Sequence, residues 1–311
     1  MDLLKQSIQD NNPNLKQSSI NQYICNVKKT LELLEGGLDD PIDTINNKSD
    51  ELIEAIEGLN ENTQKNKLNA ILKVVDSDSA TAKNYRDRRD LLQSRYNDRV
   101  SSGEKSEKEE ERMITKEQYD YVLDTLHQKI DGLSKSDLPL KKNQWKYWLG
   151  YMLLSLYKEI PLRNDLAGMI VIDNKTWREH RYKLDNTKNY LVVGARIVQI
   201  ILNQYKTNKT YGRKIIKTSP GLAKIIKNYL TLKPEGKYFI VNNQGLEMLN
   251  TTLSRFISNL FLEFLDTQTG ITALRKSYLT NKYGDIKQEM AEDANIMGHS
   301  VATQQKIYVK K

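Results

Sequence analysis

The sequence contains few residues that bind metals or form disulfides. Cys25 is the only cysteine and cannot form an internal disulfide. The three histidines, His127, His180 and His299, do not combine with it at any zinc-ligand spacing. With 15 glycines and 6 prolines among 311 residues, collagen-like and low-complexity classes are excluded. We therefore expect no metal site and no cofactor.

Long hydrophobic runs are also missing. The longest apolar stretch, residues 147–157, is too short to cross a bilayer, and residues 1–10 are too polar for a secretory signal. The sequence thus predicts a protein that is neither membrane-bound nor secreted, and that acts in the cytoplasm or nucleus. Because 311 residues exceed what one hydrophobic core usually organises, two domains are expected.

Charge divides the chain unevenly. The run SSGEKSEKEEER at residues 101–112 lacks apolar periodicity and is typical of a solvated linker or of a frayed helix end. Residues 1–113 contain 17 Lys and Arg against 22 Asp and Glu (17 − 22 = −5), whereas residues 114–311 contain 31 against 18 (31 − 18 = +13). The second part therefore offers most of the surface for an anionic partner. We predict a domain at residues 1–100, a linker at 101–113 and a second domain at 114–311.

Helical periodicity dominates the first domain and predicts a bundle of four or five helices. The segments with this periodicity are residues 19–34, 47–59, 62–75 and 79–99. The last of them carries a basic stripe on an otherwise acidic domain, formed by Lys83, Arg86, Arg88, Arg89, Arg95 and Arg99. This stripe has two interpretations, a solvated face of i,i+4 ion pairs or a DNA-contacting face.

In the second domain, the apolar residues follow a helical period over the first two segments and a strand-like pattern after them. Helices are predicted at residues 115–130, 142–158, 221–230, 246–265, 271–282, 285–297 and from 302 to the end. Strand-like, β-branched segments are residues 169–173, 190–193, 197–205 and 214–218, with a turn at 206–213. The expected fold class is mainly α with a small antiparallel β-sheet.

Six positions of the second domain form an ordered set. Arg163 lies in PLRND before the first strand, Lys209 in the hairpin turn, and Thr272 begins TALR. The remaining members are Arg275, His299 after Gly298, and Tyr308. This set resembles the tyrosine recombinase, or phage-type integrase, family, whose pattern is Arg, a hairpin Lys, His-x-x-Arg, Gly-His and a C-terminal nucleophilic Tyr. The resemblance covers most of the chain. The segments PLRND, YKTNKTYG and TALRKSYL look most like those of the branch found in large eukaryotic DNA viruses and related mobile elements.

The resemblance implies both architecture and activity. Residues 1–100 look like the family's helical core-binding domain, which is SAM-like, and residues 114–311 look like its α+β catalytic domain. The implied activity is site-specific recombination or integration. Duplex DNA is cleaved and rejoined through a 3′-phosphotyrosyl intermediate in a DNA-bound homo-tetramer, without ATP or a metal. No GxxxxGK[ST] phosphate loop is present in the sequence.

The chemistry explains why these residue types belong together. Two fixed guanidiniums, Arg163 and Arg275, suit the non-bridging oxygens of a phosphate under attack. By resemblance Lys209 gives a proton to the leaving 5′-hydroxyl, with Lys206 as the less favoured neighbour. His299 would donate a hydrogen bond to the phosphate, and Tyr308 would attack it. We expect these side chains to converge in one basic concavity, except that the tyrosine can be displaced in a DNA-free state.

Three features depart from the family pattern. Thr272 stands where the family usually has a histidine, and a threonine hydroxyl is not a general base at neutral pH. The acidic residue that usually follows the first arginine by three positions is here Asp165, two positions after Arg163. The sequence continues for three residues after Tyr308, whereas many relatives extend into a helix that docks in a neighbouring protomer.

Contact with DNA outside the site should be electrostatic, since phosphates are neutralised by Lys and Arg. The candidates are Lys83, Arg86, Arg89, Arg213 and Lys214. Two other functions stay open. One is strand relaxation by an enzyme like type IB topoisomerases, and the other is a catalytically weakened, recombinase-derived DNA-binding protein.

Overall fold

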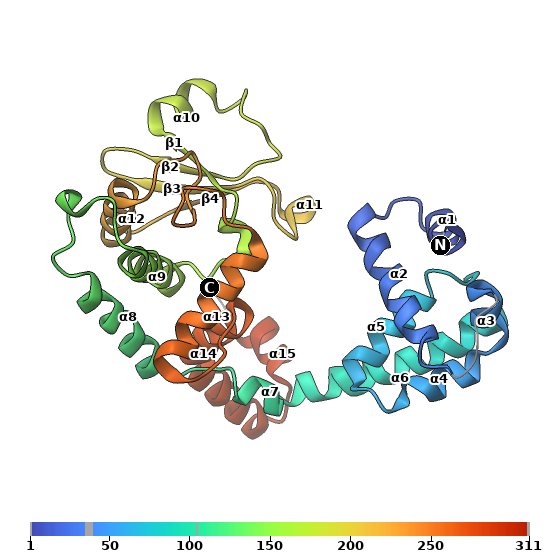
Figure 1. Cartoon of the computed structure of the whole chain (residues 1–311). Helices are drawn as coiled ribbons and strands as arrows, with labels where there is room; N and C mark the ends of the chain where they lie inside the picture. The colour runs from blue at the N-terminus through green and yellow to red at the C-terminus, as the bar shows by residue number, and fades with distance from the viewer. Residues whose placement is uncertain (1, 35–39, 104, 310–311) are drawn as a thin grey trace. The chain divides into compact units, whose positions relative to one another are not determined.

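The chain is mainly helical with a small four-stranded sheet, and it divides into two compact units (Figure 1). The computed structural model describes residues 2–34, 40–103 and 105–309. The units are Met1–Glu104 and Lys105–Lys311. The boundary between them lies inside the predicted linker, and residue 104 is outside the described ranges. No helix in these ranges is long and apolar enough to span a bilayer.

The first unit is a helical bundle. Its helices are α1 (Asp2–Asn11), α2 (Gln17–Leu31), α3 (Pro41–Asn47), α4 (Ser49–Glu57), α5 (Glu61–Ile71) and α6 (Ala80–Ser102). The sequence did not predict α1 and α3. Pro41, which we took as part of a break, occupies the first turn of α3, and the Asp40 side chain caps that helix by accepting a hydrogen bond from the Ile42 amide at 2.8 Å.

The second unit contains the sheet and the remaining helices. The helices are α7 (Glu107–Glu110), α8 (Lys116–Ile130), α9 (Lys142–Glu159), α10 (Asn174–His180), α11 (Asn208–Tyr211), α12 (Pro220–Leu232), α13 (Asn250–Leu265), α14 (Ile271–Ile296) and α15 (Val301–Thr303). Short 3-10 turns occupy Lys135–Asp137 and Asn164–Leu166, and one π-helical turn occupies Gln304–Tyr308. The 3-10 turn at Asn164–Leu166 is called η2 below.

The sheet is mixed, which corrects the prediction of an antiparallel one. Its strands follow chain order: β1 (Ile170–Asp173), β2 (Tyr190–Val193), β3 (Val198–Leu202) and β4 (Lys214–Lys217). β2 to β4 pair antiparallel as expected, but β1 and β2 pair parallel. The reason is that residues 174–189 cross over between them and include α10, and parallel neighbours require such a crossover.

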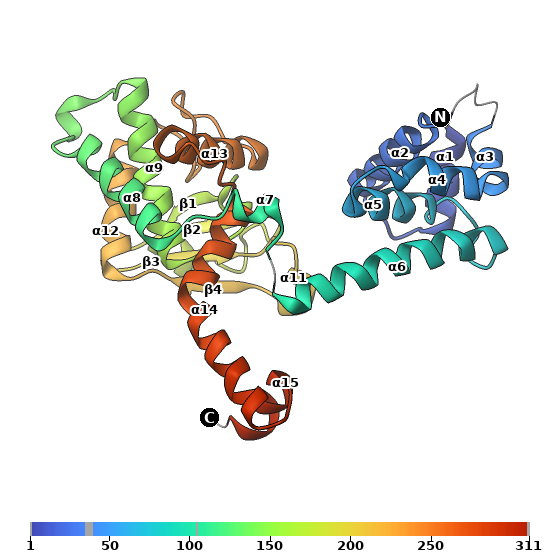
Figure 2. The same cartoon turned by 90° about the horizontal axis from the view of Figure 1, so that it is seen from below.

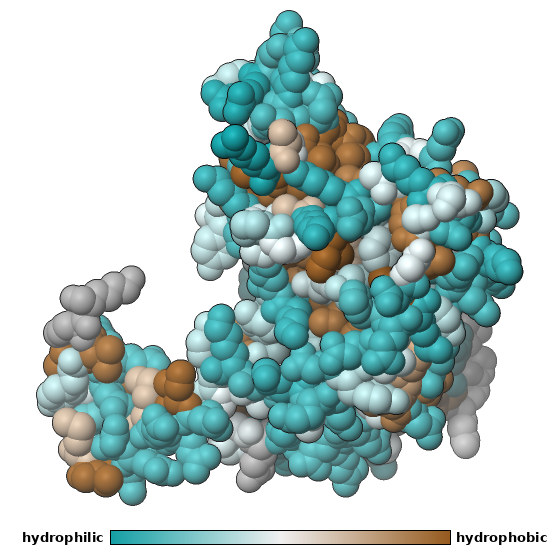
Figure 3. Space-filling view, turned by 90° about the vertical axis from the view of Figure 1, so that its left-hand side faces the viewer, coloured by the Kyte–Doolittle hydropathy of each residue, from teal (hydrophilic) through white to brown (hydrophobic). Residues whose placement is uncertain are grey.

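The main core of the second unit lies around α9. This helix is buried on most sides, with Leu149, Met152 and Leu153 among its fully covered side chains, and it packs against α8 and α12. A separate small cluster on the sheet gathers Trp177 from α10 with Tyr190, Val192 and Ile201. α10 is thereby fixed to the sheet by apolar packing. The face seen in Figure 3 is mainly hydrophilic, with several smaller hydrophobic patches.

α14 is one uninterrupted helix of 26 residues, whereas the sequence predicted two helices with a break at Tyr283–Gly284. A glycine inside a helix costs only about 1 kcal/mol relative to alanine, so it does not by itself end one. From Leu279 to Asp293 no side chain of α14 is buried. Figure 2 shows this half of the helix extending away from the sheet and from α8 and α9.

The start of α14 is held by the segment that we predicted to be a linker. The Ile114 amide donates a buried hydrogen bond to the Ser277 hydroxyl at 3.0 Å, and Lys276 forms an ion pair with Glu109 of α7. Residues 105–113 thus belong to the second unit and hold the start of α14.

Candidate active site

Arg163 and Arg275 come to the same part of the fold, although 112 positions separate them (275 − 163). Arg163 is exposed at the start of η2, and its carbonyl accepts a hydrogen bond from the buried Tyr157 hydroxyl at 3.3 Å. Arg275 is half-buried in α14, and its Nε donates to the Pro161 carbonyl at 2.9 Å. Burial lowers the pKa of Arg275, and the positive charge of Arg163 lowers that pKa further. The bond to Pro161, two positions before Arg163, brings Arg275 to the segment that carries Arg163.

One carboxylate and one lysine complete the charged group around the arginines. Burial raises the pKa of Asp165, while the charges of Arg163, Arg275 and Lys214 act in the opposite direction. Among the described residues neither arginine forms a salt bridge. Three cations therefore face a single half-buried carboxylate. Uncompensated positive charge of this kind favours an anionic ligand.

The lysine whose charge acts on the Asp165 carboxyl is Lys214, the first residue of β4. Its Nζ lies 4.9 Å from the ring centre of Tyr205 and 5.3 Å from that of Tyr211. Lys209 and Lys206 are exposed on the β3–β4 hairpin, and no contact ties either to the arginines. The sequence predicted the hairpin correctly. The spacing of the family motif favoured Lys209 within the turn, and Lys214 was predicted only as a residue that contacts DNA.

Asn189 is a positioning residue that sequence reasoning missed. Its side chain is 9% exposed, and its Oδ1 accepts hydrogen bonds from the Asn203 and Gln204 amides at 2.9 and 2.8 Å. Its Nδ2 donates to the Asp165 carbonyl at 3.1 Å. Asn189 thus connects η2 to the base of the hairpin. An asparagine directly before a buried strand was the only sequence signal for this role.

His299 and Tyr308 form a second pair, at the far end of α14. The His299 amide donates to the Ala294 carbonyl at 3.0 Å and the Gly298 amide to the Asn295 carbonyl at 3.2 Å, with Gly298 at φ 70°. These bonds make a Schellman cap, which requires the positive φ that glycine adopts readily. The structural role of Gly298 is therefore that of a helix terminator.

The two rings of this second pair are stacked. The centroids of His299 and Tyr308 are 5.0 Å apart with an interplanar angle of 14°. His299 Nε2 is buried without a hydrogen-bond partner in the described part of the chain, whereas Tyr308 is 58% exposed. The phenol is accessible, and the imidazole lies against its ring.

The two pairs are far apart in the described state. α14 has 26 residues, and at 1.5 Å per residue it spans about 39 Å. Arg275 lies near its start and Tyr308 follows its end (Figure 2). Arg163 therefore lies beside Arg275, and His299 beside Tyr308, but the four side chains do not meet. The expectation of one concavity holding all of them is not met within this chain. Thr272 is exposed in the first turn of α14.

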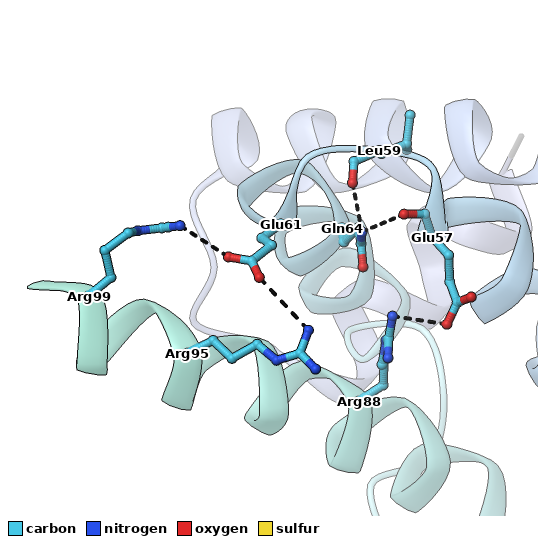
Figure 4. A network of polar contacts seen from close by, with 7 residues as sticks. All are labelled: Glu57, Leu59, Glu61, Gln64, Arg88, Arg95 and Arg99. Atoms are coloured by element: carbon cyan, nitrogen blue, oxygen red, sulfur yellow. Dashed lines mark hydrogen bonds and ion pairs between the residues drawn. The ribbon is translucent and has the colours of Figure 1, made fainter. Parts of the chain in front are cut away.

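The basic stripe of α6 is largely paired within the first unit. Figure 4 shows Arg88 bound to Glu57 at 2.9 Å, and Arg95 and Arg99 bound to Glu61 at 3.9 and 3.3 Å. These ion pairs join α6 to α4 and α5, so the pairs that form are between helices rather than at i,i+4 along one helix. They occupy cations that a DNA backbone would otherwise attract.

The individual DNA-contact candidates differ in the hydrogen bonds and ion pairs that their side chains already form. Lys83 is exposed without an ion pair in the described ranges, Arg86 donates to the Ser77 carbonyl at 2.7 Å, and Arg89 pairs with Asp90 at 2.6 Å. Arg213 donates from Nε and Nη2 to the Asn203 and Asn186 side-chain oxygens, both at 2.6 Å. The Arg213 guanidinium therefore stabilises the hairpin through these two hydrogen bonds.

In the described residues, no three His, Cys, Asp or Glu side chains lie together as a metal site.

No protein-family model matches the sequence, and a search of curated proteins finds no match. The functional assignment therefore depends on the geometry of this chain and on the motif resemblance.

Proposed function

We propose that this protein is a site-specific DNA recombinase or integrase that cleaves and rejoins duplex DNA through a 3′-phosphotyrosyl intermediate. The observation that carries the proposal is the bond from Arg275 to the Pro161 carbonyl, which brings Arg275 to the segment of Arg163, while neither guanidinium forms a salt bridge in the described chain. Such a group is suited to a phosphate whose oxygens gain negative charge during attack. The helical unit at residues 1–104 is proposed as the second DNA-contacting unit.

The proposed reaction balances without an external energy source. The Tyr308 oxygen loses its proton to solvent and attacks the phosphorus, and the bond from phosphorus to the 5′-oxygen breaks. The leaving oxygen takes a proton from the Lys214 ammonium. Rejoining reverses these steps, because the phosphotyrosyl bond retains the energy of the phosphodiester. The Thr272 hydroxyl can donate a hydrogen bond to the phosphate.

The position of Tyr308 implies that the site is completed by a second copy of the chain. α14 is continuous, and its start is bonded to Pro161 and to Ile114, so Tyr308 stays far from the arginines of its own chain. Leu279, Tyr283 and Ile286 lie exposed at helical spacing on the same helix and offer an apolar stripe to a partner. We infer that Tyr308 of one copy attacks at the arginine pair of another, within a DNA-bound oligomer.

A suicide substrate tests the proposal directly. The wild-type protein is incubated with a duplex nicked close to the cleavage position, so that the cleaved fragment diffuses away and the covalent adduct accumulates. We expect an adduct that survives denaturant, with the DNA 3′ end attached to the peptide containing Tyr308. Absence of any adduct on a duplex that the protein binds, or attachment at another residue, would contradict the proposal.

The separation of Tyr308 from the arginines favours one alternative, a recombinase-derived protein that binds DNA without cutting it. In that case the duplex is retained in a gel-shift assay while no adduct forms at any protein concentration. If a second copy completes the site, adduct should form, and its yield should rise steeply with protein concentration.

The two hairpin lysines provide a further prediction. Replacing Lys214 with alanine should slow single-turnover cleavage by about 10²- to 10⁴-fold, the usual contribution of a general acid. The matched change Lys209→Ala should slow it less than about 10-fold, because removing one solvated charge mainly weakens binding.

The role of Lys214 as an acid can be separated from a packing role. A substrate whose 5′-bridging oxygen is replaced by sulfur releases a thiolate, which leaves without a proton. Lys214→Ala should regain near wild-type cleavage on this substrate. If Lys209→Ala has the larger defect and is the one rescued, the acid is Lys209, as the hairpin motif predicts.

A further inference from the structure

The crossover between β1 and β2 carries a cluster of cations that the proposed reaction does not use. Residues 174–188 contain five Lys and Arg but only two acids, Glu179 and Asp185. The cations are Lys175, Arg178, Arg181, Lys183 and Lys188, and all of them are exposed. This set is called the crossover cluster. The top of the view in Figure 3, where α10 lies, is mainly hydrophilic.

The crossover cluster is held on a rigid support. Trp177 is 8% exposed and packs with Tyr190, Val192 and Ile201 of the sheet. The Asp173 carboxylate caps α10 by accepting a hydrogen bond from the Thr176 amide at 2.8 Å. Lys175 and Arg178 therefore project from a helix that is packed on the sheet, and the other three cations follow it along the chain.

The cations of the crossover cluster form no salt bridge with a carboxylate among the described residues, although the charge of Lys188 acts on Asp185. None of them forms a salt bridge within the described ranges, in contrast to the arginines of α6. Asp185 is used by its own turn, since its Oδ1 accepts hydrogen bonds from the Thr187 amide and hydroxyl at 2.8 and 2.6 Å. Arg181 lies 4.7 Å from the ring centre of Tyr182, which is 82% exposed. Several unpaired like charges on one surface destabilise each other unless an anion neutralises them.

The crossover cluster is joined to the arginine site through the hairpin. Arg213 bridges Asn186 of the crossover and Asn203 of the hairpin, and its guanidinium lies 5.9 Å from the Trp177 ring centre. The residue after Arg213 is Lys214, which belongs to the charged group around the arginines. The two positive surfaces are therefore held in a fixed relation to each other.

We propose that the crossover cluster binds the backbone phosphates of the duplex that flanks the cleaved position. This inference rests on the proposed function, because the duplex at the cluster is the same substrate that reaches the arginine pair. B-form DNA presents one negative charge about every 1.7 Å along its axis, so a duplex that leaves the site meets the cluster as a continuous anionic surface. The contacts are to phosphates and are independent of base sequence.

The test is a triple neutralisation, Lys175→Gln, Arg178→Gln and Lys183→Gln, made in the background Tyr308→Phe so that binding alone is measured. The affinity for a duplex is followed by fluorescence anisotropy over a range of salt concentrations. The slope of log affinity against log salt should become shallower by about 2.7, three times the value of about 0.9 for each phosphate contact. At about 0.1 M salt the affinity should fall by about 100-fold or more.

A matched control changes net charge equally at another place. Lys135, Lys141 and Lys142 are exposed around the start of α9 and have no ion pair in the described ranges. The corresponding triple glutamine variant should change the salt slope by less than about 1. Both variants should unfold at the wild-type temperature, because the altered side chains are solvated.

The outcomes separate this inference from the proposed function. Equal slopes for the two triple variants overturn the inference, whether or not wild-type protein forms the Tyr308 adduct. A shallower slope for the cluster variant supports it, even if no adduct is found and the proposed cleavage fails. A larger loss of binding to single-stranded RNA or to anionic lipid vesicles than to the duplex also overturns it.

Discussion

Tyr308→Phe should abolish the covalent adduct on a nicked duplex while leaving the affinity for that duplex unchanged. The substitution removes the phenolic oxygen, which is the atom proposed to bond to phosphorus, and keeps the ring that stacks on His299 at 5.0 Å. Since Tyr308 is 58% exposed, the loss of its hydroxyl should leave stability unchanged. The measurement is the yield of denaturant-resistant adduct, alongside a gel-shift titration.

The chain offers a matched control for this substitution. Tyr283 is also exposed, at 48%, and lies on the same helix. Tyr283→Phe should trap DNA as the wild type does. Equal trapping by the Tyr308 variant and the wild type would show that another nucleophile acts and would remove the basis of the recombinase proposal.

A mixture of Arg275→Ala and Tyr308→Phe should form adduct although each variant alone does not. Arg275→Ala should reduce cleavage by about 10²- to 10³-fold, because a charge-stabilising group at the phosphate is lost. In the mixture, the tyrosine of the first variant meets the intact arginines of the second. If the copies assemble at random, about a quarter of sites combine both intact halves, so adduct yield should approach that fraction of wild type.

The control mixture combines Arg163→Ala with Arg275→Ala. No site in it has both guanidiniums, whichever copy donates the tyrosine, so it should stay inactive. An inactive mixture of Arg275→Ala and Tyr308→Phe would mean that Tyr308 acts with the arginines of its own chain. α14 would then have to break, and Gly284 is the residue at which a break is least costly.

Much of the fold was accessible from local patterns in the sequence. β1 and β2 were predicted nearly residue for residue, because β-branched runs there are bounded by polar turns. The hairpin between β3 and β4 was also predicted correctly. The direction of β1 relative to β2 was not, since pairing depends on the path of residues 174–189 and not on the composition of either strand.

The candidate site was accessible only in part. Motif order selected Arg163 and Arg275, and the structure places them together because the start of α14 is bonded to Pro161. The same motif selected Lys209, with Lys206 as the less favoured neighbour, whereas the lysine whose charge acts on Asp165 in the fold is Lys214. Asn189 had no periodic or motif signal at all.

The sequence by itself determined the mainly helical class, the acidic and basic halves and the set of residue types that suits a phosphodiester. Tertiary structure decided where those residues lie. Local propensity operates over a few residues, so it specified that residues 271–296 are helical, but not that the helix continues through Gly284. That continuity separates Tyr308 from Arg275, because a rigid helix converts a distance along the chain into a distance in space.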